Sequence, residues 1–329
     1  MPVCAVAMLW RRLAALPASF LAIPFGFGGL ALAWRAAQPT LATPELVPNI
    51  LFLTSALLWL VVTLGTATQL VRQPRSVAAQ FRNPALSPYL SLFGIIPLVL
   101  AAGLFPYWPA AAKVVALIAV ALTVAFAGWL FGEWIAETIA LEQLHPGFFI
   151  PTVTGGALGG SVLGSFGYHS IGWMCFGISV VSWVFLESVL LYRLFRGPML
   201  AAPLVPLLAF ELAPAALVGN AWFVLHPGPA DPVAYLIAGW AVLMVFAQLR
   251  LIGVYRKTPF GPGFWAFAFS YSAVASYALD WIRQAAPPGA RALAWLTIAA
   301  ISCLVLILLE KSIRAAFRGS FLPPAPAVP

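Results

Sequence analysis

Prolines interrupt only every second apolar segment of this chain. Ten apolar segments of about bilayer-crossing length follow one another, and interior prolines occur only in the first, third, fifth and seventh: Pro24, Pro97, Pro151, Pro206 and Pro214. The ninth opens with Pro262 instead. A proline removes a backbone donor and clashes with the preceding turn, so inside a helix it bends the backbone and frees a carbonyl. The pattern therefore predicts helices of two kinds, bent odd-numbered ones and straighter even-numbered ones.

The composition places these helices in a membrane. Apolar residues make up 63% of the chain and charged residues 8%, which is incompatible with one water-facing surface around a single core. A span needs roughly 20 residues. The predicted spans cover residues 16–37, 48–71, 87–105, 110–131, 148–168, 171–194, 203–225, 232–254, 263–282 and 290–313. We expect an all-α integral membrane protein with one transmembrane domain over residues 1–329 and short tails at about 1–15 and 314–329.

The basic residues orient the chain. Most of the 17 Lys and Arg residues flank the N-terminus, the connections after the second, sixth and eighth spans, and the C-terminus. Lys and Arg stay preferentially in the cytoplasm, so both termini are expected there, in a multi-pass protein of the inner (plasma) membrane. Arg35, Lys113, Arg283 and Arg291 fall on the opposite side. The stretch 132–147 breaks the pattern, because it should be cytoplasmic yet contains three Glu and no Lys or Arg.

The net charge of +8 does not indicate a nucleic-acid partner, because the basic residues are scattered over loops and form no stripe with interleaved aromatics. Anchoring to anionic lipid headgroups accounts for them better. The three cysteines are far apart, so no disulfide framework, metal site or metal cofactor is expected. No nucleotide loop, paired-His zinc motif or intramembrane aspartate pair is present either, and the sequence therefore predicts no enzyme.

Short connections make consecutive spans antiparallel neighbours, so the chain is predicted to form five hairpins, each with a bent helix followed by a straighter one. Glycines also concentrate in odd spans, for example Gly28 in the first and Gly155 in the fifth. Small residues let helices approach closely or leave room for a passage. We therefore expect the odd helices to lie inside, around a central pore.

Four segments carry a resemblance to a known family. They are FLAIPFGFGGLALAW at 20–34, HPGFFIPTVTGGALGG at 145–160, ELAPAALVGNAW at 211–222 and PGFWAFAFSYSAVASYAL at 262–279. In their order and spacing the chain resembles the TehA-like tellurite-resistance and dicarboxylate-transporter family, which includes plant slow-type anion channels and fungal malate and sulfite transporters. The resemblance implies a pore for small anions lined by five bent helices, a phenylalanine of the ninth span that blocks it, and a homotrimer. Where the family has two adjacent prolines in the seventh span, this chain has Pro214 followed by Ala215, which implies a softer bend.

Helical spacing selects among the phenylalanines of the ninth span. Ser272 and Ser276 stand three and seven residues beyond Phe269, which gives that face the small hydroxyls that suit a water-filled pore. The corresponding positions beyond Phe267 are Ser270 and Val274. Phe269 is thus the predicted gate and Phe267 the alternative, and Pro24, Gly28, Pro97, Pro151, Gly155, Pro214, Ser272 and Ser276 are the predicted pore-lining or kink residues.

Two carboxylic acids, Glu187 and Glu211, lie inside predicted spans at nearly the same depth. A charge in the membrane is costly and therefore suggests a function, here proton exchange. The alternatives are pairing with Arg193 or Arg250, or a neutral role between helices. The histidines at 145, 169 and 226 are expected to be solvated at span ends.

Two functions follow from these features. The preferred one is an anion channel gated by a phenylalanine. The alternative is a proton-coupled carrier or exporter of a C4-dicarboxylate, sulfite or tellurite that uses Glu211.

Overall fold

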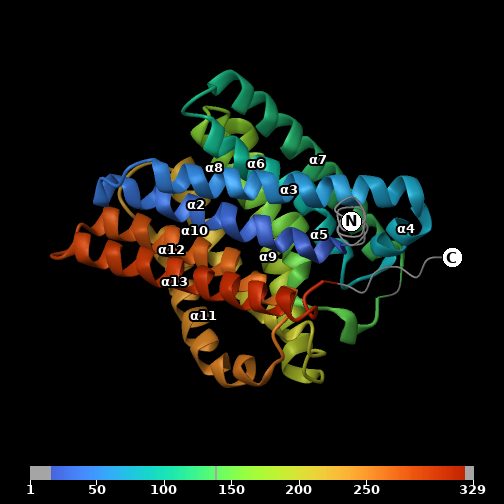
Figure 1. Ribbon diagram of the computed structural model, residues 1–329. Helices are drawn as coiled ribbons and strands as arrows, with labels where there is room; N and C mark the ends of the chain where they lie inside the picture. Colours follow the sequence, from blue (N-terminus) through green and yellow to red (C-terminus); the bar gives the residue numbers. More distant parts are fainter. Residues whose placement is uncertain (1–15, 138, 323–329) are drawn as a thin grey trace.

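The computed structural model describes residues 16–137 and 139–322, and within them the chain is helical and has no strand (Figure 1). The predicted tail at 1–15 and the end of the chain at 323–329 lie outside the described residues. Nine described helical segments are long and apolar enough to cross a membrane, as expected of a multi-pass protein.

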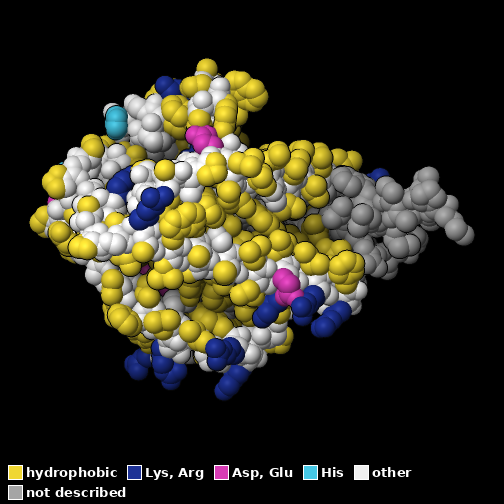
Figure 2. Space-filling view, turned by 60° about the vertical axis from the view of Figure 1, so that its left-hand side comes forward, with side chains coloured by type: hydrophobic (Ala, Val, Ile, Leu, Met, Phe, Trp, Pro, Cys, Tyr) yellow, Lys and Arg dark blue, Asp and Glu magenta, His cyan; other side chains and the backbone are white. Residues whose placement is uncertain are grey.

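The even-numbered spans are continuous helices. They are α3 (Leu46–Arg72), α7 (Pro109–Ala136), α9 (His169–Arg196), α11 (Pro232–Lys257) and α13 (Ala290–Phe317). Only 22% to 33% of the most apolar part of each is buried within the protein. Large side chains such as Leu53, Leu236 and Leu296 are therefore exposed, and Figure 2 shows a broad hydrophobic surface with Lys and Arg gathered at the lower edge of that view. Such a surface is suited to lipid rather than to water.

The odd-numbered spans are each divided into a short turn and a longer helix. The pairs are η1 (Ala18–Leu21) with α2 (Ala22–Leu41), α5 (Ser87–Leu90) with α6 (Leu92–Leu104), η3 (Pro146–Phe148) and η4 (Ile150–Thr154) with α8 (Gly155–Ser165), η5 (Val205–Glu211) with α10 (Ala213–Leu225), and η6 (Pro262–Phe264) with α12 (Trp265–Ala285). The first four of these spans are 67% to 94% buried over their most apolar part. The divided helices therefore form the interior of the protein.

The prolines mark most of these divisions. Pro24 and Pro214 lie in the first turns of α2 and α10, and Pro151 lies in the π-helical turn η4 before α8. In a first turn the missing N–H costs little, because that donor has no partner within the helix. Pro97 alone of the four lies well inside an α-helix, α6. The predicted bends thus occur mainly as changes of helix type rather than as kinks within long helices.

The ninth predicted span differs from the other nine. Its helix, α12, is 21 residues long but is not among the helices apolar enough to cross a membrane on composition. It carries three serines, Asp280 and Arg283, yet twelve of its residues are buried. A helix needs high hydropathy only where its side chains face lipid. A helix that is surrounded by other helices can therefore carry polar residues.

The divided helices pack against one another and against their continuous successors. Helix α2 contacts both α6 and α12, α8 contacts both α6 and α10, and α10 contacts α12. Each of these five helices also packs against the continuous helix that follows it in the chain. Figure 1 shows this for α2, α3, α12 and α13, which lie side by side. Two short elements, α4 (Pro74–Arg82) and η2 (Leu141–Gln143), lie in connections and were not predicted.

Candidate functional site

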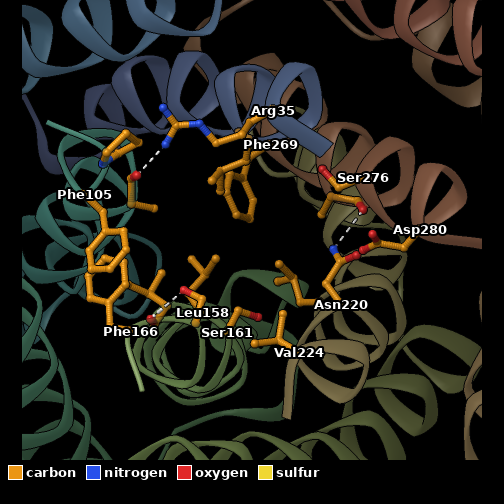
Figure 3. A pocket seen from close by; sticks show the side chains of 18 residues that line it. Arg35, Phe105, Leu158, Ser161, Phe166, Asn220, Val224, Phe269, Ser276 and Asp280 are labelled. Carbon is orange, nitrogen blue, oxygen red and sulfur yellow. Dashed lines mark hydrogen bonds between the residues drawn. The ribbon is translucent and has the colours of Figure 1, made fainter. Parts of the chain in front are cut away.

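A cavity of about 390 Å³ lies among the divided helices. Its wall contains residues from or just after all five of them: Gly29, Leu32, Arg35, Ala102, Phe105, Pro106, Leu158, Ser161, Val162, Ser165, Phe166, Leu217, Asn220, Val224, Phe269, Ala273, Ser276 and Asp280. None of these residues belongs to a continuous helix. In Figure 3 the labelled side chains surround an open centre. The interior set of helices, which the prolines single out in the sequence, therefore lines the space.

Phe269 projects into this cavity from α12 (Figure 3) and is 1% exposed. Its ring stacks on that of Phe25, with centroids 3.5 Å apart and planes 14° from parallel. One turn further along α2, Gly29 makes room for it, because a Cβ at Gly29 would lie 2.9 Å from Phe269 Cδ2. The phenyl ring is thus held against one face of α2.

The alternative candidate, Phe267, faces another part of the protein. Its ring meets the ring of Tyr255 edge-on, with centroids 4.7 Å apart and an interplanar angle of 86°, and it also stacks on Tyr271. It does not belong to the cavity wall. Of the two predicted gate residues, only Phe269 borders the cavity.

The other predicted pore residues divide between the cavity and helix contacts. Ser276 lines the cavity and donates a hydrogen bond to the Ser272 carbonyl at 3.0 Å, whereas Ser272 itself lies against Gly29. Gly28 and Gly155 face neighbouring helices instead, since an added Cβ would lie 3.0 Å from Val99 and 2.6 Å from Thr123, respectively. Their role in the structure is close packing.

The prolines are likewise outside the wall. Pro24 shows how one division is stabilised: its carbonyl accepts a hydrogen bond of 2.7 Å from Ser55 Oγ of α3. A neighbouring continuous helix thus supplies a partner to a backbone group beside the bend.

Arg35 lines the cavity and was not among the predicted site residues. The sequence places it near the end of the first span, where a basic residue ordinarily reaches the headgroups. The structure extends α2 to Leu41, so Arg35 lies within the helix and faces the interior. Its Nη1 donates to the Ala102 carbonyl, and its guanidinium lies over the Phe52 ring, 4.9 Å from the centroid. The sequence feature that could have identified Arg35 is that it is the single charged residue of α2.

Glu187 and Glu211 come together away from the cavity wall. The two carboxyl groups lie close enough to interact, and Glu187 Oε2 accepts a hydrogen bond of 2.9 Å from Trp183 Nε1. Neither carboxyl forms an ion pair among the described residues. The predicted alternative of pairing with Arg193 is wrong, because this guanidinium donates to the backbone carbonyls of Pro198 and Glu142 instead.

His145 is fully buried, so its expected position at a solvated span end is wrong. Its Nδ1 accepts a hydrogen bond from the Gly147 N–H at 3.1 Å, which leaves Nε2 to carry the proton and donate to the Pro84 carbonyl at 3.2 Å. Burial, assisted by the positive charge of Arg193, lowers the pKa of His145 to about 4, although the Pro84 carbonyl favours the protonated ring. The neutral ring therefore ties the chain before α5 to the start of η3. Within residues 16–137 and 139–322, no group of three or more His, Cys, Asp or Glu is arranged to hold a metal ion.

Comparison with known proteins agrees with this architecture. The chain is 26% identical to a tellurite resistance protein TehA homolog of Haemophilus influenzae over 264 residues, which cover 80% of each protein. The family described as voltage-dependent anion channel matches residues 15–313. Because this match spans every predicted membrane segment, the protein belongs to the voltage-dependent anion channel family.

Proposed function

We propose that this protein is an anion channel of the inner (plasma) membrane, with the cavity as part of its pathway and Phe269 as its gate. The observation that carries the proposal is that Phe269 projects into a space bordered by all five divided helices. The cycle of contacts among these helices supports the predicted arrangement of five hairpins with the odd helices inside.

An apolar ring is a sufficient gate for such a pathway. A hydrophobic constriction expels water, and an ion that must shed its hydration shell does not pass. Rotation of one phenyl ring away from the axis restores a wetted route, because the wall beyond it contains Ser161, Asn220 and Ser276. Within the residues described, one gate residue therefore separates a closed pathway from an open one.

The test is replacement of Phe269 by Ala in protein reconstituted into planar bilayers and liposomes. The Phe269→Ala protein should carry a larger nitrate or chloride current than the unmodified protein. Phe267→Ala is the matched control, because it removes the same group from the same helix but outside the cavity wall. Equal conductance of the Phe269→Ala and unmodified proteins, both eluting as folded single species, would remove the gate assignment.

A second function, a proton-coupled carrier, is favoured by the buried pair of Glu187 and Glu211. Two adjacent buried carboxylates repel each other when both are charged, so such a pair is suited to take up and release one proton. The cargo of this carrier would be a dicarboxylate, sulfite or tellurite, and tellurite resistance is named for the Haemophilus relative. It predicts saturable flux without unitary current steps, and a flux that falls in Glu211→Gln. Unitary steps that survive in Glu211→Gln decide for the channel.

A further inference from the structure

Arg35 is the one basic side chain among the residues of the cavity wall. Its Nη2 is buried and has no hydrogen-bond partner among the described residues. No carboxylate forms an ion pair with it there. The carboxylate of Glu45, just before α3, is near enough to attract the guanidinium, but it accepts a hydrogen bond of 2.8 Å from Tyr107. The cavity wall therefore includes a positive charge whose guanidinium has one buried N–H group left without a partner.

The surroundings hold this guanidinium in place without neutralising it. The Ala102 carbonyl takes one N–H, and the face of the Phe52 ring supports the planar group. Both partners are uncharged. Asp280, the acid in the wall, is already paired with Arg283, whose Nη2 lies 2.8 Å from Asp280 Oδ1. The charge of Arg35 therefore remains available to a mobile anion.

The position of Arg35 relative to Phe269 follows from helix geometry. Gly29 touches the phenyl ring, and Arg35 lies six residues further along α2. At 1.5 Å per residue the two positions are roughly 9 Å apart along the helix axis. Ser276 lies seven residues beyond Phe269 on α12, so the two helices carry polar groups beyond the ring within one cavity. An anion bound at Arg35 would therefore lie about two helical turns from Phe269, the proposed gate.

We infer that Arg35 is a docking site for a small oxyanion or carboxylate on one side of Phe269. The inference rests on the proposed anion pathway and adds to it the residue that receives the ion. A guanidinium offers its donors in a planar fork that matches the oxygens of nitrate, sulfite or a carboxylate, whereas a spherical halide uses only its charge. The largely apolar wall strengthens the attraction by lowering the local dielectric constant.

The cavity has room for such a ligand together with water. At about 390 Å³ it holds on the order of a dozen water volumes. The hydroxyl of Ser161 and the remaining N–H of the Asn220 amide line the same space and can replace part of the hydration shell, whereas the Ser276 hydroxyl already donates to the Ser272 carbonyl. The oxyanion thus loses water on entry in exchange for one charged and two neutral hydrogen-bonding groups.

The experiment measures the half-saturating concentrations of nitrate and chloride for flux into liposomes, with every variant made in the Phe269→Ala background. Arg35→Gln should raise the nitrate value about tenfold, the equivalent of about 1.4 kcal/mol for a lost charge-assisted hydrogen bond. Arg35→Lys keeps the charge but loses the fork, so it should raise the nitrate value about threefold and leave the chloride value within about twofold. Arg291→Gln, an exposed residue of α13 outside the wall, is the matched control and should change neither.

An unchanged half-saturating concentration of nitrate in Arg35→Gln overturns the docking site. Equal changes of the half-saturating concentrations of nitrate and chloride in Arg35→Lys overturn the preference of the site for oxyanions. If Arg35→Gln does not fold, Arg35→Lys gives the second test, because it keeps the charge and should still raise the half-saturating concentration of nitrate about threefold. An unchanged nitrate value in a folded Arg35→Lys protein contradicts the inference. Failure of Phe269→Ala itself to conduct refutes the proposed gate, and that result is distinguishable from a conducting Phe269→Ala protein that is indifferent to Arg35.

Discussion

Phe25 should control how readily the gate opens. Its ring stacks on Phe269 at a centroid distance of 3.5 Å and therefore stabilises the position in which the Phe269 ring projects into the cavity. An aromatic pair of this kind is worth about 0.5 to 1.5 kcal/mol beyond its buried area. If the ring leaves this position when the gate opens, Phe25→Ala should raise the open population about 2- to 12-fold, since 1.4 kcal/mol corresponds to a factor of ten.

The assay is anion flux through single and double variants in liposomes. Phe25→Ala should give a flux between those of the unmodified and Phe269→Ala proteins. The Phe25→Ala/Phe269→Ala protein should conduct like Phe269→Ala alone, because the residue that Phe25 restrains is already absent.

A matched control is available on the same helix. Phe27 is also buried, but it pairs with Trp265 at a centroid distance of 5.3 Å and lies outside the cavity wall, so Phe27→Ala should leave flux unchanged. A flux in Phe25→Ala equal to that of the unmodified protein would refute the restraint. A further rise in the double variant would show that Phe25→Ala opens a separate leak.

Three further predictions concern packing, pH and assembly. Gly29→Ala places a Cβ 2.9 Å from Phe269 Cδ2 and 3.2 Å from Ser272 Cβ, so thermal unfolding in detergent should show a loss of about 1 to 3 kcal/mol, with less loss for the uncrowded Gly239→Ala. Because the pKa of His145 is about 4 in the folded protein and about 6.5 when unfolded, the stability it contributes is complete above pH 6.5 and falls as the pH drops toward 4. Unfolding at pH 5 should show a loss of about 2 kcal/mol that is absent in His145→Gln, and equal pH dependence of the two proteins contradicts it. Native mass spectrometry in detergent should detect a trimer, the assembly that the family resemblance implies, and a monomer at all concentrations argues against it.

Much of the fold is predictable because proline and glycine report directly on helix packing in a membrane. The alternation of Pro24, Pro97, Pro151 and Pro214 separates the divided helices from the continuous ones, and the buried shares of the two sets differ accordingly. The type of bend was not predictable in this way. A proline is compatible with an interior kink and with a junction between helix types, and neighbours such as Ser55, which bonds the Pro24 carbonyl, are set by the tertiary structure.

Only the part of the candidate site that depends on one helix could be predicted from the sequence. The serine spacing on the ninth span favours Phe269 over Phe267, and Phe269 lines the cavity together with Ser276, while its role as a gate stays a prediction. Arg35 was missed because its orientation depends on how far α2 continues past the predicted end of the span. The burial of His145 depends in the same way on the Pro84 carbonyl, which is distant in sequence.

The sheltered position of α12 also affects how the two ends of the chain are assigned to compartments. Within residues 16–137 and 139–322, nine helical segments are long and apolar enough to cross a membrane, an odd number that would place the ends on opposite sides of the bilayer. If α12 is a tenth crossing, as the sequence predicts, the number is even and both ends lie on one side. Helices that line a water-filled route are the ones that hydropathy under-counts, so parity errors in such proteins should arise at the element that matters most for transport. Alkaline phosphatase fused after α13 should accordingly be inactive, and the same reporter fused after α12 should be active.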